Sequence, residues 1–144
     1  IGFRKLFNYI SGSNIDKAKI SMTAPVIQST KISMTTPVTQ FNKNGEKIMQ
    51  FFLPSKFSKN YAPQPVDKSL KLINIPQGYY GVIKFSGRLT DKNFNKHINI
   101  LKENLLNNNI EVLSSSIKAV YNGPFTLPFL RRNEAMFRID WLDK

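Results

Sequence analysis

The 144-residue sequence contains no cysteine. Disulfide bonds, thiolate metal sites, iron–sulfur clusters, covalently attached c-type haem and cysteine nucleophiles are therefore all excluded. The absence of cysteine leaves the cellular compartment undecided.

Long apolar runs are also missing. No stretch approaches the ~20 residues that a membrane-spanning helix needs, and no signal-peptide pattern is present. The sequence opens at Ile1 without an initiator methionine, inside an amphipathic segment, so we expect residues to be missing upstream. We predict a soluble protein without a membrane span, and the cytoplasm is the favoured compartment.

Catalytic machinery is not visible in the sequence. There is one histidine, His97, and the nine carboxylates are mostly isolated along the chain. Catalysis by side chains needs a nucleophile with a base, a pair of acids or a metal cluster. The sequence also lacks the G-x-S-x-G, P-loop and H-E-x-x-H motifs. We predict a protein that is not an enzyme and has no catalytic residues.

Apolar and basic residues are abundant. Hydrophobic residues make up 41% of the chain, including eleven Phe, five Tyr and one Trp. This is enough to build the core of one domain.

The formal net charge of +12 favours anionic partners, such as nucleic acid, anionic lipid or a ligand with carboxylates. The lysines are scattered and no basic stripe alternates with aromatic residues, so a dedicated nucleic-acid role is disfavoured.

An internal repeat is the most conspicuous feature. Residues 19–28 read KISMTAPVIQ and residues 31–40 read KISMTTPVTQ, twelve residues further on. Each block alternates as a half-buried strand does. Pro25 and Pro37 must lie at a strand edge, a strand end or a bulge, because proline cannot donate to a ladder. We predict that the two blocks form paired or consecutive strands.

Two helices are predicted. Apolar residues recur at helical spacing over Gly2–Ser11 and stop before a Gly-Ser-Asn run. Thr90 can cap a second helix over Asp91–Asn107. The apolar face of that helix comprises Phe94, Ile98, Leu101 and Leu105.

Strands account for most of the remaining apolar runs. They are predicted over Lys47–Leu53, Leu70–Ile75, Tyr79–Phe85 and Ala135–Trp141, with at least one more inside Ile110–Tyr121. Residues 55–68 and 122–130, which are rich in proline and aromatic residues, are predicted to be loops. Runs of strands interrupted by two helices, without regular strand–helix alternation, predict an α+β domain with a mainly antiparallel sheet.

Several motifs together resemble the SOUL haem-binding protein family. They are GFR and YISGSN within residues 2–14, the two KISMTxPV blocks, FSG at 85–87, and YNGP at 121–124 leading to RRNE at 131–134. No single motif is specific, but the ordered set is, and it covers nearly the whole chain. The doubled block is similar to bacterial members in particular.

The resemblance implies a single domain over residues 1–144. Its fold would be a pseudo-symmetric, antiparallel, barrel-like sheet of two βαββ-like halves with two helices packed outside. Family members usually carry strands before the first helix, and we expect this chain to lack them. Members are described as binding haem or other tetrapyrroles in a surface cleft beside the first helix. The fold is also similar to that of bacterial effector-binding domains, which hold bulky cationic drugs.

The apolar residues of the first helix and of the aromatic loop form the candidate site. Haem requires a large, flat, apolar pocket, donors for two propionates and, optionally, an axial iron ligand. The family would place Leu6, Phe7 and Ile10 at the cleft, and Phe125 and Phe129 are candidates for the opposite wall. Each of these residues has a structural alternative, as core packing for the first three and as a clamp that closes the fold for the last two.

Arg131 is the candidate partner for a propionate. A guanidinium can bind a carboxylate through two hydrogen bonds. The structural alternative is that the arginines and Glu134 tie the last strand to the aromatic loop. Basic residues near the first helix are further candidates for the propionates: Arg4, Lys5 and Lys17.

No residue is predicted to ligate iron. His97 falls on or beside the buried stripe of the second helix, where a lone histidine is more often packed and hydrogen bonded than metal bound. Met22 and Met34 occupy matching positions of the repeat, and a thioether can ligate haem iron, but methionine more often fills gaps in a core. We therefore predict a non-covalent haem cofactor and no metal-ligating side chain.

Reversible, non-covalent binding of haem or another tetrapyrrole, for sequestration, transport or buffering, is the leading hypothesis. The alternative is a binding module for other amphipathic small molecules or for a protein partner, similar to the effector-binding domains. An enzyme acting on tetrapyrroles is disfavoured because no side-chain machinery is visible. The sequence carries no indication of an oligomeric state.

Overall fold

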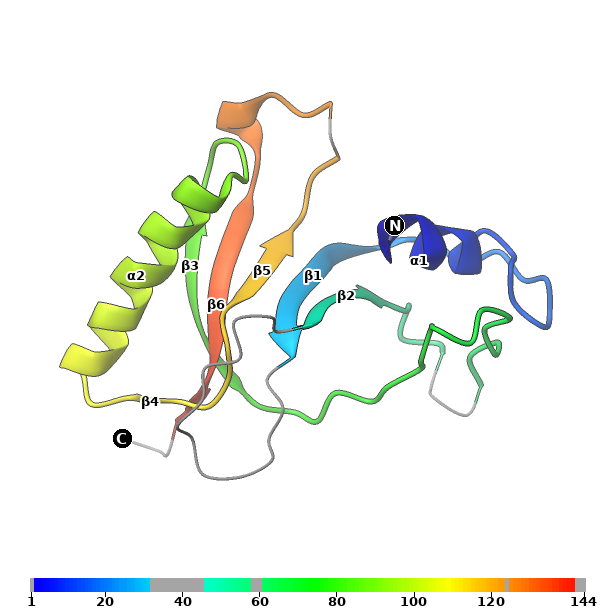
Figure 1. The fold of residues 1–144 in the computed structure, drawn as a ribbon, viewed down its shortest axis with the longest axis horizontal. Helices are drawn as coiled ribbons and strands as arrows, with labels where there is room; N and C mark the ends of the chain where they lie inside the picture. Colours follow the sequence, from blue (N-terminus) through cyan, green and yellow to red (C-terminus); the bar gives the residue numbers. More distant parts are fainter. Residues whose placement is uncertain (1, 32–45, 58–60, 124, 142–144) are drawn as a thin grey trace.

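The computed structural model describes residues 2–31, 46–57, 61–123 and 125–141. Its elements, in chain order, are α1 (Gly2–Ile10), β1 (Thr23–Lys31), β2 (Glu46–Phe52), β3 (Tyr79–Phe85), α2 (Asp91–Asn107), β4 (Glu111–Val112), β5 (Ile117–Val120), a short 3₁₀ helix η1 (Pro128–Leu130) and β6 (Asn133–Asp140). Figure 1 shows α1 beside β1 and β2, and α2 beside β3 and β6.

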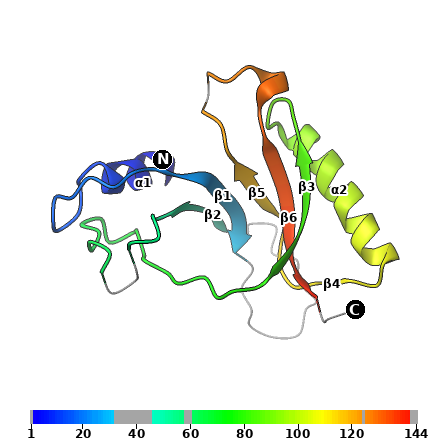
Figure 2. The ribbon, with the colours of Figure 1, turned by 180° about the vertical axis from the view of Figure 1, so that it is seen from behind.

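All the described strands belong to one antiparallel sheet. The strand order is β2-β1-β5-β6-β3, and the short β4 pairs with β6 outside this path. The predicted α+β class with two helices and an antiparallel sheet is confirmed. Among the described residues the sheet is open, with β2 and β3 at its two ends, so these residues do not form a closed barrel. From behind, β5, β6 and β3 run side by side, with the two helices at opposite sides of the molecule (Figure 2).

The two helices pack on the same face of this sheet. Residues directly opposite each other in an antiparallel pair point to the same face. Phe51 of β2 lies opposite Val26 of β1, which in turn lies opposite Val120 of β5. The Phe51 ring contacts α1, while Lys118, two residues before Val120, has its ammonium group 4.6 Å from the ring centre of Phe94 in α2. The register therefore leaves the other face of the sheet free of both helices.

Helix α2 builds the main core against β3 and β6. It begins where predicted, because the Thr90 side chain accepts a hydrogen bond from the Asn93 amide at 3.1 Å. Its buried stripe is the predicted one: Phe94, Ile98, Leu101 and Leu105. Gly81 of β3 allows the helix to come close, since a Cβ atom at this position would lie 3.1 Å from a Leu105 methyl carbon. The core is completed by Phe85 of β3 and by Ala135, Phe137 and Ile139 of β6.

Helix α1 builds a second, smaller core. Its buried residues are Tyr9 and Ile10, together with Ile20 from the first repeat block. The amide of Ile20 donates to the carbonyl of Ile10 at 2.7 Å, so the start of the block is bound to the end of the helix. The strand accordingly begins only at Thr23, later than predicted.

The repeat is described only in its first half. Pro25 lies where the register of β1 against β2 shifts, between Thr23 and Val26, as expected for a proline at a bulge. The second block lies outside the described residues except for Lys31, so its pairing stays a prediction.

The strand predicted over Leu70–Ile75 is wrong. This segment makes no ladder with the described strands and runs as an extended connection toward β3 (Figure 1). Its alternation has another cause, because Leu70 and Leu72 are half-buried against the α1 core while Lys71 and Ile73 are exposed. Alternation of apolar and polar residues indicates an extended chain with one buried side. It does not show that the chain pairs with a neighbouring strand.

Candidate functional site

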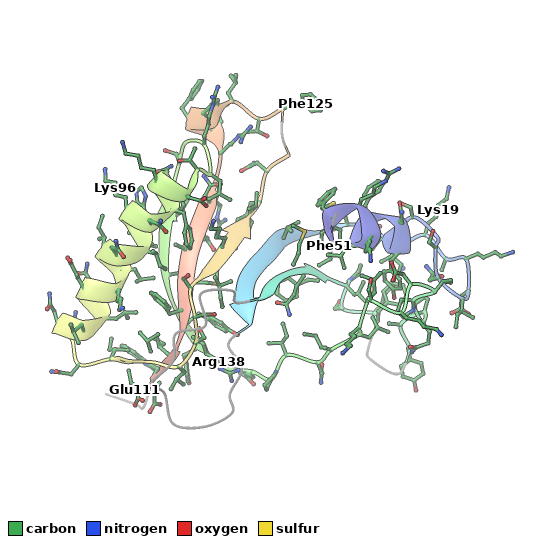
Figure 3. The ribbon with its side chains drawn as sticks, viewed as in Figure 1. Lys19, Phe51, Lys96, Glu111, Phe125 and Arg138 are labelled. Carbon is green, nitrogen blue, oxygen red and sulfur yellow. The ribbon has the colours of Figure 1, made fainter. Side chains whose placement is uncertain are left out.

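Three phenylalanine rings form a half-exposed patch on α1 and β2, which we call the aromatic face: Phe3, Phe7 and Phe51. Phe3 and Phe7 are four residues apart on the helix, and their rings are stacked with centres 6.2 Å apart and planes inclined by 13°. The edge of Phe51 from β2 meets Phe3 at 5.3 Å. The helical rings are 45% and 47% exposed, so a ligand can reach them. Figure 3 shows Phe51 beneath α1.

The three predicted residues of α1 differ in accessibility. Phe7 belongs to the aromatic face, Leu6 beside it is half-buried, and Ile10 is only 5% exposed because it packs in the α1 core. Ile10 therefore occupies the core position that was its structural alternative.

Hydrogen bonds hold the end of α1 in place. The Tyr9 hydroxyl donates to the Pro63 carbonyl at 2.6 Å. The buried Asn14 side chain donates to the carbonyls of Tyr9 and Ala18 and accepts from the Ala18 amide. The asparagine of the YISGSN motif thus fixes the turn after the helix, and the aromatic face sits on a rigid support.

A small pocket lies on another side of α1. Its volume is about 210 Å³, and it is lined by Lys5, Asn8, Tyr9, Ser13, Val66, Asp67 and Leu70. Lys5 pairs with Asp67 at 3.5 Å and donates to the Ser69 hydroxyl at 2.8 Å. Hydrogen bonds from the side chain and the amide of Ser69, aided by Lys5, lower the pKa of the Asp67 carboxyl. The volume is below the roughly 300–1,000 Å³ of typical ligand pockets, so it is too small for a tetrapyrrole.

The predicted second wall projects into solvent. Phe125 is 99% exposed and Phe129 is 71% exposed, so neither acts as a clamp that closes the fold. The loop that carries them stands at the far end of β5 and β6, away from α1 (Figure 1). The Arg131 side chain donates from Nε to the Thr126 carbonyl at 2.8 Å, which braces the loop. The described residues thus do not bring the loop residues and α1 into one pocket.

The second arginine of the pair binds the buried carboxylate of Glu134. Arg132 donates to the Glu134 carboxylate at 2.6 Å, and the Tyr121 hydroxyl donates to the other oxygen of that carboxylate at 2.8 Å. The guanidinium also lies 4.3 Å from the centre of the Tyr121 ring. This arrangement ties β6 to the end of β5, and the Arg132 amide donates to the Asn122 side chain at the start of the loop at 2.6 Å. Burial raises the pKa of Tyr121, and the nearby Glu134 carboxylate raises it further.

Stability is expected to fall in alkaline solution because of two tyrosines. Burial and the charge of Asp16 raise the pKa of Tyr9, as burial and Glu134 raise that of Tyr121. Above pH ~10 the unfolded chain loses these protons first, so the folded state binds more protons and unfolding is favoured as the pH rises. The contribution is fully present below that pH and is lost as the pH passes the folded-state pKa values.

Chemical denaturation at several pH values from about 9 to about 11 measures this effect. Tyr9→Phe and Tyr121→Phe should each make the free energy of unfolding fall less steeply with pH. The reduction in slope should correspond to at most one bound proton for each variant. Tyr61→Phe, at an exposed site, is the matched control. Equal slopes in all four proteins would contradict the prediction.

His97 lies on α2, remote from the aromatic face. Its ring is stacked on Phe85 with centres 4.3 Å apart, and Nδ1 lies 2.7 Å from the Asn93 carbonyl oxygen. In the part of the chain that the structure describes, no three His, Cys, Asp or Glu side chains are grouped to hold a metal ion. Met22 is exposed before β1, and Met34 lies outside the described residues.

Sequence reasoning did not include two members of the aromatic face. Phe3 shares the helical spacing of Phe7, and this spacing was the signal that could have found it. Phe51 comes from a distant part of the chain and carries no local signal.

None of the described helices is long and apolar enough to cross a membrane.

Comparison with known proteins agrees with the sequence motifs. The sequence model of the family described as SOUL heme-binding protein matches residues 1–138. No curated protein matches the chain. Since the family match extends over nearly the whole sequence, the chain belongs to the SOUL heme-binding protein family.

Proposed function

We propose that the protein binds haem or another tetrapyrrole reversibly and non-covalently, and that the aromatic face carries the macrocycle. The observation that supports this most strongly is the stacked, half-exposed Phe3–Phe7 pair. A flat apolar macrocycle gains contact with such rings and removes their exposed area from water. Family membership favours the same class of ligand.

Positive charge next to the aromatic face suits the propionates. Arg4 is exposed and precedes Phe7 by three residues, so the two side chains are neighbours on the helix surface. Lys5 is engaged with Asp67 and Ser69 on another side of the helix. We therefore assign one propionate to Arg4, which can form two parallel hydrogen bonds to a carboxylate.

The other parts of the predicted site remain proposals of lower rank. Phe125, Phe129 and Arg131 would contribute only if the loop and α1 enclosed the ligand together. The bound iron would accept an axial ligand, but we assign no side chain of this chain to it. We propose a carrier or buffer and not an enzyme, because the aromatic face contains no acid, base or nucleophile.

The element order also supports the predicted pseudo-symmetry. Helix α1 is followed by the paired strands β1 and β2, and α2 is followed, after the short β4, by the paired strands β5 and β6. The strands β1 and β5 pair with each other between these two units. We propose that the units are the two halves of the family's fold, with β3 completing the second one.

Hemin titration followed by absorption tests the function. We expect a shifted Soret band and a dissociation constant in the micromolar range or tighter, which corresponds to about −8 kcal/mol or more. Iron-free protoporphyrin should bind nearly as well, because the rings supply most of the affinity. Hemin extracted afterwards should be unchanged, whereas turnover would indicate an enzyme. An unshifted Soret band at tens of micromolar protein would favour the alternative binding module.

Replacing His97 by alanine is expected to change hemin affinity by no more than a few-fold. The ring is packed on Phe85 and hydrogen bonded within α2, away from the aromatic face. Titration and the spin-state bands of the spectrum measure the result, and circular dichroism checks the fold. Loss of the Soret shift in a folded variant would move the site to α2.

A further inference from the structure

We infer that the loop between β5 and β6 binds the surface of an anionic lipid bilayer through an apolar tip. Single exposed apolar side chains are common on proteins, but several large ones gathered in one loop mark an interaction site. We define the tip by the exposed apolar residues of this loop, which are Phe125, Leu127, Phe129 and Leu130. Their exposed fractions are 99%, 55%, 71% and 62%.

The tip is held in a defined shape. The Gly87 amide, in the turn between β3 and α2, donates to the Pro128 carbonyl at 2.8 Å. The Asn133 side chain donates a hydrogen bond to the Gly87 carbonyl at 2.9 Å. Within η1, the Leu130 amide donates to the Leu127 carbonyl at 2.9 Å. Because these bonds hold η1 in place, little conformational entropy is lost when Leu127, Phe129 and Leu130 enter another phase.

Basic residues occur in the segments that flank or contact the loop carrying the tip. Arg88 follows Gly87 in the turn that contacts the loop, Lys92 lies in the first turn of α2, and Arg131 follows η1 directly. An apolar group within a basic rim matches a bilayer, which presents acyl chains behind anionic headgroups.

The carboxylates at this end of the molecule are neutralised. Asp91 pairs with Lys118 at 2.9 Å, and the buried carboxylate of Glu134 pairs with Arg132. The carboxylates of Glu111 and Asp140 lie opposite each other at the other end of β6. Figure 3 shows Phe125 and Glu111 at opposite ends of the molecule. This polarity would orient the protein with the tip toward a negative surface.

This inference goes beyond the proposed function and does not depend on it. Helix α1 and the loop between β5 and β6 lie apart in the fold (Figure 1), so the aromatic face and the tip can each be removed without the other. The chain supplies a matched pair of variants for this purpose, each lacking two phenylalanine rings: Phe125→Ala with Phe129→Ala, and Phe3→Ala with Phe7→Ala.

Co-sedimentation with lipid vesicles provides the first test. We expect the protein to bind phosphatidylcholine vesicles that contain about 30% phosphatidylserine, and to bind phosphatidylcholine alone at least about tenfold more weakly. Binding should also weaken as salt is raised, because the rim charges are screened. The loop double variant should lose at least about tenfold in vesicle affinity and the α1 double variant little. Arg88→Glu should weaken binding to the anionic vesicles only.

Fluorescence of a tryptophan at the tip provides the second test. Phe125→Trp in a Trp141→Phe background should show a blue shift with anionic vesicles, and lipid-borne quenchers should reduce its emission. The parent protein, whose single Trp141 follows β6 at the other end, should show neither change.

Three outcomes would overturn the inference. The first is absence of vesicle binding, and the second is binding that the loop double variant retains in full. The third is self-association in the absence of lipid that the loop double variant abolishes, which would make the tip a contact between copies of the chain. Hemin titration of the α1 double variant separates this inference from the proposed function, since that variant should lose hemin affinity and keep its vesicle binding.

Discussion

Replacing Phe94 by alanine is expected to lower the free energy of unfolding by about 3–5 kcal/mol. Phe94 is 4% exposed and belongs to the core between α2 and the sheet. Its removal would leave a cavity beside Phe85, which the close-packed sheet and helix can fill only in part. The ring also lies beneath the Lys118 ammonium group, so a cation–π contact is lost as well.

Leu106→Ala is the matched control for this substitution. Leu106 is on the same helix but 73% exposed, and its truncation should change stability by no more than about 0.5 kcal/mol. Denaturant unfolding followed by circular dichroism measures both variants. The slope against denaturant should stay the same while the midpoint moves. Similar losses in the two variants would show that α2 does not bury its apolar stripe as described.

Removing both helical rings of the aromatic face is expected to weaken hemin binding at least tenfold. Each phenylalanine offers a large apolar area, and about 1 kcal/mol of lost contact per ring corresponds to roughly 30-fold in affinity for the pair. Phe3→Ala with Phe7→Ala should remain folded, because both side chains are about half exposed and the anchoring residues Tyr9 and Ile10 are retained.

The loop double variant serves as the control for hemin as well. Phe125→Ala with Phe129→Ala removes the same two rings from the predicted second wall and should leave hemin affinity within a few-fold. Soret titrations of the parent and of both variants decide between the two surfaces. If the loop variant loses affinity and the α1 variant does not, the tetrapyrrole binds at the loop and the aromatic face is ordinary surface.

Local patterns determined the elements that depend on neighbouring residues alone. Helix α2 has its predicted bounds because the Thr90 cap and the apolar residues at helical spacing all lie within one short segment of the sequence. Strand β3 also has its predicted bounds, since it alternates clearly and is followed directly by a turn with Gly87 in a left-handed conformation. The family followed from ordered motifs along the whole chain, and this prediction was confirmed.

Predictions that depend on contacts with residues far away in the sequence were less accurate. The alternation of Leu70–Ile75 has a cause in the α1 core and not in a neighbouring strand, which no local pattern reveals. Ile10 and Phe7 look alike as apolar residues of one helix. One is buried by Ile20, and the other is left half exposed.

The α+β class, both helices and the SOUL family could be predicted from the sequence, because caps, periodicity and motifs act over short distances. Which apolar residues form a surface depends on the folded chain as a whole. The contact of Phe51 with Phe3 depends on how β2 pairs and how α1 docks, and the exposure of Phe125 and Phe129 depends on the loop's position at the end of β5 and β6. Burial depends on every part of the chain that comes near, and sequence spacing records only the neighbours along the chain.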